Sequence, residues 1–163
     1  MKKNKGMTII ELLISIVLIS IVISFIMQFF LKTRNTYINN TIDVKNELSK
    51  SIIIDSVMSD FITKDLTSIE NEDDKIVFHY NGEDKTLEVK EAETENGEVY
   101  LVSYSGGSEI PVVREYLKSE VEYEGIDYET ISDGSNDLRI FTIHLIGLDG
   151  RDYSIVLYCP DNL

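Results

Sequence analysis

The chain begins MKKNKGMTIIELLISIVLISIVISFIMQFFL, residues 1–31, and the interpretation of the remaining residues starts from this stretch. Six residues that include three lysines precede an almost unbroken apolar run from Met7 to Leu31. One acid, Glu11, lies near the start of that run. An ionised side chain at the centre of a bilayer costs about 2.5–3.5 kcal/mol, so an acid within such a run points to a function that requires it.

The apolar run is long enough to cross a membrane as a helix. Its 25 residues would extend roughly 37 Å, against a hydrocarbon core of about 30 Å. A secretory signal peptide usually has a shorter apolar region followed by a small-residue cleavage site, and no such site follows Leu31. Cleavage after Gly6 would instead leave the apolar helix on the mature protein. The lysines before the run favour a cytoplasmic N-terminus, with the following domain outside.

Residues 5–12 read Lys-Gly-Met-Thr-Ile-Ile-Glu-Leu. This segment resembles the processing and methylation signature of type IV prepilins and type II secretion pseudopilins, and the resemblance covers about the first 30 residues. In that family a membrane peptidase cuts after the glycine and methylates the new N-terminal amine. The resemblance therefore implies cleavage between Gly6 and Met7 and N-methylation of Met7, which stands where the family usually has phenylalanine.

The resemblance also implies an assembly role for Glu11. In family filaments this acid pairs with the N-terminal amine of a neighbouring subunit, and such a pair in a low-dielectric bundle sets register more than affinity. The alternative is local, because an acid in the first turn of a helix interacts favourably with the helix dipole.

The composition restricts what the remaining residues can bind. The 163 residues suit one domain beyond the membrane segment. Loss of residues 1–6 leaves 12 basic against 29 acidic side chains, a formal net charge of −17. Nucleic acid binding needs cations that neutralise phosphates, so no nucleic-acid partner is expected. The single cysteine, Cys159, cannot form an intrachain disulfide and is expected to be a buried thiol.

The helix is expected to continue beyond Leu31. No glycine or proline interrupts residues 32–66, and apolar residues recur there at nearly helical spacing. We therefore predict one helix of 60 residues from Met7 to Leu66, roughly 90 Å long, whose second half is amphipathic.

Strand patterns follow the helix, at residues 75–80, 86–90, 98–104, 137–146 and 151–159. Residues 110–123 fit a helix about as well as strands, and residues 125–137 look like a loop. Asp149-Gly150, between the last two strands, predicts a type I′ hairpin turn.

The predicted fold class is α+β. An antiparallel sheet of four to six strands is expected to pack on the distal half of the long N-terminal helix, which is the type IV pilin fold that the resemblance implies. The expected segments are a cleaved leader at 1–6, a transmembrane or filament-core helix at 7–31, its amphipathic continuation at 32–66, and an antiparallel β head at 67–163.

No catalytic residues, metal ligands or cofactor motif emerge from the sequence, and no enzymatic activity is expected. His79 and His144 lie in predicted strands, where a half-exposed structural histidine is the expected role. The acidic stretches 70–74 and 133–137 offer oxygen atoms for calcium but lack EF-hand spacing. The prediction is therefore no cofactor.

Two functions remain open. The first is a minor pilin or pseudopilin, a structural subunit of a type IV pilus or a related secretion or uptake filament. Its partners would be the prepilin peptidase, the major pilin and other minor pilins, the membrane assembly platform, and the lipid bilayer before assembly. It would be a single-pass membrane protein first and part of a cell-surface pilus or pseudopilus later. The alternative is an uncleaved single-pass membrane protein with a ligand-binding ectodomain.

Overall fold

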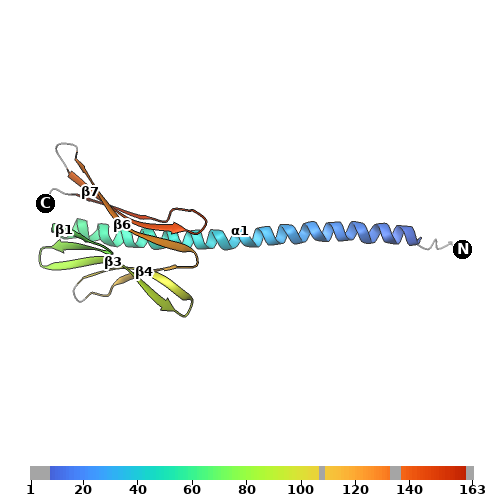
Figure 1. The fold of residues 1–163 in the computed structure, drawn as a ribbon, viewed down its shortest axis with the longest axis horizontal. Coiled ribbons are helices and arrows are strands. Elements are labelled where there is room, and N and C mark those ends of the chain that lie inside the picture. Colours follow the sequence, from blue (N-terminus) through green and yellow to red (C-terminus); the bar gives the residue numbers. More distant parts are fainter. Residues whose placement is uncertain (1–7, 107–108, 133–136, 161–163) are drawn as a thin grey trace. The chain divides into compact units, whose positions relative to one another are not determined.

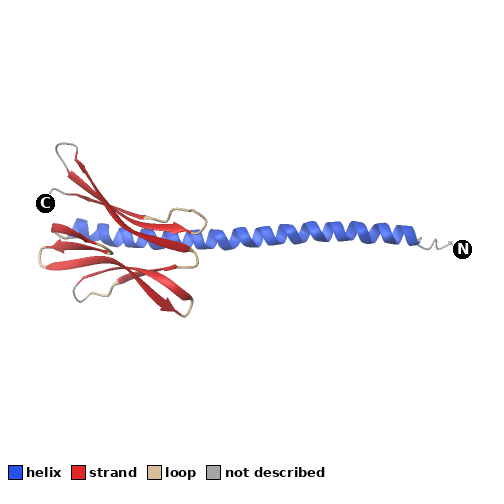
Figure 2. Cartoon of the chain, viewed as in Figure 1, coloured by secondary structure: helices blue, strands red, loops and turns tan. Residues whose placement is uncertain are grey.

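One helix and eight strands make up the computed structural model, which describes residues 8–106, 109–132 and 137–160 (Figures 1 and 2). Helix α1 spans Ile9–Thr63, and it ends three residues before the predicted Leu66. The chain divides between Val44 and Lys45 into two compact units.

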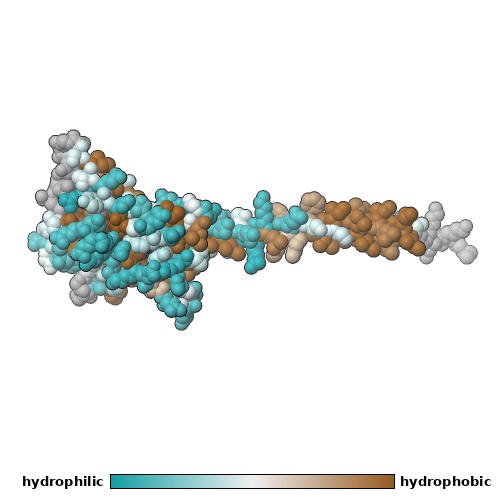
Figure 3. Space-filling model, viewed as in Figure 1, coloured by the Kyte–Doolittle hydropathy of each residue, from teal (hydrophilic) through white to brown (hydrophobic). Residues whose placement is uncertain are grey.

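The first unit consists of the N-terminal part of α1. Between Ile9 and Leu31 no large apolar side chain is buried, and Figure 3 shows this stretch as an almost continuous apolar surface. Within the described residues, α1 is the helix whose length and composition suit a membrane crossing. Isoleucine, leucine, valine and phenylalanine dominate this stretch, so every side of the helix is apolar, as expected of a helix that lipid or other helices surround.

The second unit joins the C-terminal part of α1 to two antiparallel sheets. The first sheet is a five-stranded meander in the order β1-β2-β3-β4-β5. Its strands are β1 Leu66–Glu72, β2 Lys75–Tyr80, β3 Glu83–Thr94, β4 Gly97–Gly106 and β5 Val112–Leu117. The second sheet has the order β6-β7-β8, with β6 Val121–Ser132, β7 Asp137–Gly147 and β8 Ile155–Pro160. The α+β class, with a long apolar helix followed by antiparallel strands, is confirmed.

One core joins this segment of α1 to both sheets. The helix contributes Ile53 and Val57, the first sheet contributes residues such as Phe78, and the second contributes residues such as Phe141. Alternate residues are buried along the strands, as in β2, where Ile76, Phe78 and Tyr80 point inward. Cys159 is fully buried in the same core, as expected. Burial raises the pKa of its thiol to about 12.

The helix face that packs on the sheets is more polar than the sequence indicated. Its buried residues are Asn46, Ser49, Ile53, Val57 and Asp60, at intervals of three and four. Leu48, which the apolar spacing placed inside, is instead 60% exposed. The spacing prediction fails there because polar residues occupy the buried positions at both ends of the packed segment.

Two strands were missed, and the sheet count was too low. We expected one sheet of four to six strands, whereas the described residues form two sheets with eight. β1 begins at Leu66, the predicted end of the helix, and no strand was predicted for the residues after it. β6 extends through residues 125–132, which we expected to be a loop. β1 is an edge strand with exposed acids, and its apolar residues, Leu66 and Ile69, lack the alternation that marks a half-buried strand. β6 does alternate, but Gly125 interrupts its pattern and made the segment look like a loop. Pairing with β2 and β7 supplies their hydrogen bonds instead.

Gly125 lies at an irregularity within β6. The register with β7 shifts between Tyr123 and Gly125, and Gly125 has a φ of 125°. A bulge of this kind requires a residue that accepts a positive φ, which glycine does without a steric penalty. Gly125, which made residues 125–137 look like a loop, therefore lies at a bulge within a strand.

The turn at Asp149-Gly150 is not type I′. A type I′ turn needs positive φ at both central residues, but among the described residues only glycines have positive φ, Gly150 with 81°. The Gly150 N–H donates to the Gly147 carbonyl at 2.7 Å, and the Gly147 N–H donates to the Arg151 carbonyl at 2.7 Å. This is the three-residue hairpin loop in which a type I turn precedes a left-handed glycine.

Candidate functional site

The start of α1 is built as a reciprocal capping box. Thr8 immediately precedes the helix, and its carbonyl accepts the first intrahelical bond from the Leu12 N–H at 3.1 Å. The Glu11 N–H donates to Thr8 Oγ1 at 3.3 Å. In return, the Thr8 N–H and hydroxyl donate to Glu11 Oε2 at 2.8 and 2.9 Å. Two orphan amides of the first turn are thus satisfied, and the acid is held toward the N-terminal end of the helix.

The predicted processing residues, Gly6 and Met7, lie outside the described residues. Of the predicted site residues the structure therefore describes Glu11 alone. Cleavage after Gly6 would make Met7 the first residue, bonded directly to the Thr8 nitrogen that donates to Glu11. The sequence reasoning overlooked Thr8, although Thr8-Ile-Ile-Glu11 ahead of an apolar run is a readable capping-box signature.

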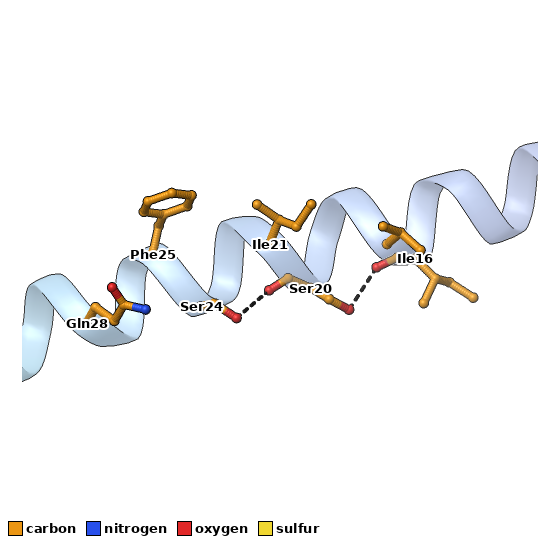
Figure 4. A pocket seen from close by; sticks show the side chains of 7 residues that line it. Ile16, Ser20, Ile21, Ser24, Phe25 and Gln28 are labelled. Carbon is orange, nitrogen blue, oxygen red and sulfur yellow. Dashed lines mark hydrogen bonds between the residues drawn. The ribbon is translucent and has the colours of Figure 1, made fainter.

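Polar groups farther along the apolar helix are satisfied within it. The hydroxyls of Ser15, Ser20 and Ser24 each donate to the carbonyl four residues earlier, at 2.7–2.9 Å. Figure 4 shows the last two of these bonds along one side of the helix, with the Phe25 ring projecting away from them. The residues drawn there line a shallow, open hollow on the helix surface. Because each serine hydroxyl has a partner within the helix, these residues can enter an apolar environment at low cost.

A second polar cluster lies in the 45–163 unit, where the end of α1 meets the first sheet. Asp60 is 9% exposed, and its carboxylate accepts hydrogen bonds from Lys85 Nζ at 2.9 Å and from the Tyr104 hydroxyl at 2.8 Å. Lys64, just beyond the helix, contacts the other oxygen of Asp60 at 3.1 Å. The two lysines also form close ion pairs with Glu83 and Glu109, Lys64 with the first and Lys85 with the second.

The charges of this cluster stabilise one another. Burial by itself raises the pKa of the Asp60 carboxyl, but hydrogen bonds from Lys85, Tyr104 and Lys64 outweigh burial and hold this pKa below its ordinary value. Burial, together with the hydrogen bonds to Tyr80 and Asp60, raises the pKa of the Tyr104 hydroxyl. The two lysines and the Tyr104 hydroxyl all contact Asp60, so the cluster fixes the end of the helix to the sheet.

We expect the stability of the 45–163 unit to fall in acid because of Asp60. The folded carboxyl has the lower pKa, so the unfolded chain takes up the proton first as the pH falls. The stabilisation is complete above the ordinary value of 3.8 and is lost as the pH falls through the folded value. Thermal unfolding of the detergent-solubilised chain between pH 6 and about pH 3 measures this loss. Asp60→Asn should flatten the pH dependence, and an unchanged slope in that variant would assign the effect to other acids.

Both predicted structural histidines are partly buried and face acids. His79 Nδ1 lies 2.8 Å from Asp84 Oδ1, and His144 Nε2 lies 3.2 Å from Asp127 Oδ2. The hydrogen bond to Asp84 raises the pKa of His79. In the part of the chain that the structure describes, no three histidine, cysteine or acidic side chains converge as a metal site would require. Residues 133–136, which make up most of the acidic stretch 133–137, lie outside the described residues.

The comparison with protein families identifies the N-terminus. Residues 1–27 match the model of the prokaryotic N-terminal methylation motif, the signature of type IV pilins and pseudopilins. The predicted resemblance is therefore confirmed, and the motif describes structural subunits rather than a class of enzymes. The motif supports processing by a prepilin peptidase and, with the exposed apolar part of α1, membrane anchoring. No curated protein and no solved structure is similar enough to this chain to count as a match.

Proposed function

We propose that this chain is a minor pilin or pseudopilin of a type IV pilus or a related secretion or uptake filament. The observation that carries the proposal is the methylation motif at residues 1–27, which overlaps the apolar, exposed part of α1. An apolar surface on every side of a helix suits two successive environments, the bilayer and the core of a fibre made of packed helices. The antiparallel sheets after the helix are those expected of a pilin head.

In this proposal the peptidase cuts between Gly6 and Met7 and methylates the Met7 amine. Glu11 then pairs with the N-terminal amine of a neighbouring subunit. The capping box supports this role, because it holds the carboxylate toward the end of the helix where the new amine is made. Within the described residues only Thr8 donates to this carboxylate, and Thr8 carries no charge to neutralise it.

Before assembly the chain would be a single-pass membrane protein with its N-terminus in the cytoplasm and the sheets outside. Lys2, Lys3 and Lys5 on the cytoplasmic side support this orientation. Its partners would be the prepilin peptidase, the membrane assembly platform, the major pilin and other minor pilins. No nucleic-acid partner is proposed, because residues 45–163 carry 27 acidic and 10 basic side chains.

Assignment as a minor subunit rests on three features of the sequence. A single cysteine cannot form the disulfide loop typical of many major pilins, the head is strongly acidic, and no proline precedes Pro111. The abundance of this chain in purified fibres, relative to the other subunits, tests the assignment directly. A chain that forms the bulk of the fibre would be a major pilin instead.

Processing gives the sharpest test of the proposed function. Co-expressed with its prepilin peptidase, the chain should lose Met1–Gly6, and mass spectrometry should find an N-methylated Met7. Gly6→Leu is the matched control and should remain uncleaved, because a large side chain replaces the small residue at the cut. If Met1 is still attached to the wild-type chain in that experiment, the alternative holds, namely an uncleaved membrane protein with a ligand-binding ectodomain.

A further inference from the structure

A groove in the 45–163 unit separates α1 from β5. Its helix side includes Lys45, Leu48 and Ile52, and its strand side is formed by residues 113–115. β5 is the last strand of the five-stranded sheet, and among the described residues it pairs only with β4, so one edge of its backbone has no neighbouring strand there. An unpaired edge beside a groove can accept a further strand.

Two cations, Lys45 and Arg114, and one acid, Glu115, line the groove, so its net charge is positive within a strongly acidic unit. Seven lysines and arginines of residues 45–163 pair with acids within 4.0 Å, among them Lys50 with Glu47 and Lys118 with Glu91. Lys45 and Arg114, one on each side of the groove, make no ion pair within the described residues. Two unneutralised cations in a unit with 27 acids favour an acidic partner.

Buried polar atoms on the same two elements also lack partners within the described residues. They are Nε of Arg114, the hydroxyl of Tyr116 and the amide of Asn46. Asn46 is 1% exposed and adjoins Lys45, and Tyr116 is fully buried two residues after Arg114. A buried polar group without a hydrogen bond costs about 1–3 kcal/mol. A polar segment that enters the groove would reduce that cost where it reaches these atoms.

An acidic edge that fits this groove exists on the chain itself. β6 is an edge strand of the second sheet and pairs only with β7. Glu122, Glu124 and Glu129 of β6 are all exposed. Two β6 edges would repel each other, whereas β6 offers negative charge to the Lys45 and Arg114 side chains that flank β5.

We propose that the groove beside β5 binds strand β6 of a second copy of this chain, so that the first sheet of one copy continues into the second sheet of the next. The two surfaces differ, so the contact is heterologous. For a minor subunit, the place where two copies can meet in this way is the membrane before assembly. The inference rests on the proposed function only in that copies must lie side by side in the membrane.

A photoreactive residue on β5 tests the contact in the full-length chain in membranes. Benzoylphenylalanine in place of the exposed Glu115 should yield a cross-linked dimer, and mass spectrometry of the peptides should place the link within residues 121–132 of the other copy. The same probe at Glu72, exposed on the opposite edge strand β1, is the control and should yield no cross-linked dimer. Links from position 72 to β6 of the same chain are expected, because Tyr123 donates a hydrogen bond to Asp74, and they leave the chain a monomer. A link from position 115 to the apolar helix or to a different protein would overturn the proposal.

Charge reversal separates this contact from chance proximity. Lys45→Glu with Arg114→Glu should lower the cross-linked fraction about tenfold, as expected for loss of close interfacial charge pairs. Adding Glu122→Lys, Glu124→Lys and Glu129→Lys in the same chain should restore most of the link. A cross-linked fraction that neither set of substitutions changes would contradict the proposal. Removal of the leader is measured on the same samples. Absence of the contact between groove and β6 can therefore be distinguished from absence of processing by the peptidase.

Discussion

Glu11→Ala should exclude the chain from assembled fibres while cleavage after Gly6 continues. Removal of one partner of a buried ion pair typically costs about 3–5 kcal/mol, which is more than a hundredfold in an association constant. The peptidase acts on the segment before the helix, so loss of the carboxylate leaves its substrate intact. Mass spectrometry of the membrane fraction measures cleavage, and immunodetection in sheared fibres measures incorporation.

Glu11→Gln distinguishes the two roles that the structure allows for this side chain. Glutamine keeps the capping box with Thr8, because its amide oxygen accepts the same hydrogen bonds, but it cannot neutralise an amine. If pairing with a neighbouring amine is the role of Glu11, Glu11→Gln fails to assemble as Glu11→Ala does. Normal incorporation of Glu11→Gln would mean that Glu11 acts only as a helix cap.

Asp60→Ala should destabilise the 45–163 unit more than any surface change. The substitution leaves Lys85, which is 4% exposed, without the buried carboxylate it contacts, and removes the acceptor of the Tyr104 hydroxyl. Breaking a buried pair in this way costs about 3–5 kcal/mol, which corresponds to roughly 10 °C or more in Tm for a domain of this size. Thermal unfolding of the detergent-solubilised chain, followed through its tyrosines by near-ultraviolet circular dichroism, measures the change.

Glu47→Ala is the matched control for Asp60→Ala. Glu47 also pairs with a lysine of the same unit, Lys50 at 3.4 Å, but its side chain is exposed. An exposed pair of this kind contributes about 0–1 kcal/mol, so Tm should hardly change. If both variants unfold at the same temperature as the wild type, the Asp60 cluster does not hold the helix to the sheet.

Strands with one buried face could be predicted from the sequence, and strands at exposed edges could not. β2 was predicted to the residue, because Ile76, Phe78 and Tyr80 alternate with less buried positions. β1 was missed because pairing with the adjacent strand β2, and not its own acidic sequence, makes it a strand. β6 was missed because the bulge at Gly125 interrupts the alternation of its apolar residues. Tertiary context overrides propensity most readily at such positions.

The residues of the candidate site could also be predicted from the sequence only in part. Gly6, Met7 and Glu11 were found from a local motif, and the family match to residues 1–27 agrees with it. The helix-capping role of Thr8 was not predicted, although Thr8 and Glu11 have the spacing of a capping box. The groove beside β5 could not be foreseen, because its two sides, Lys45 and Arg114, are separated by 68 intervening residues.

The sequence by itself determined where the apolar helix lies and that strands follow the helix, and it predicts where a peptidase would cut. These properties depend on neighbouring residues, through the hydropathy along one helix and through a short motif of consecutive residues. Tertiary structure alone decided that polar Asn46 and Asp60 are buried while Leu48 is exposed, and which strand edges stay open. Those outcomes depend on which distant segments pack together, because burial and charge pairing are properties of the assembled unit.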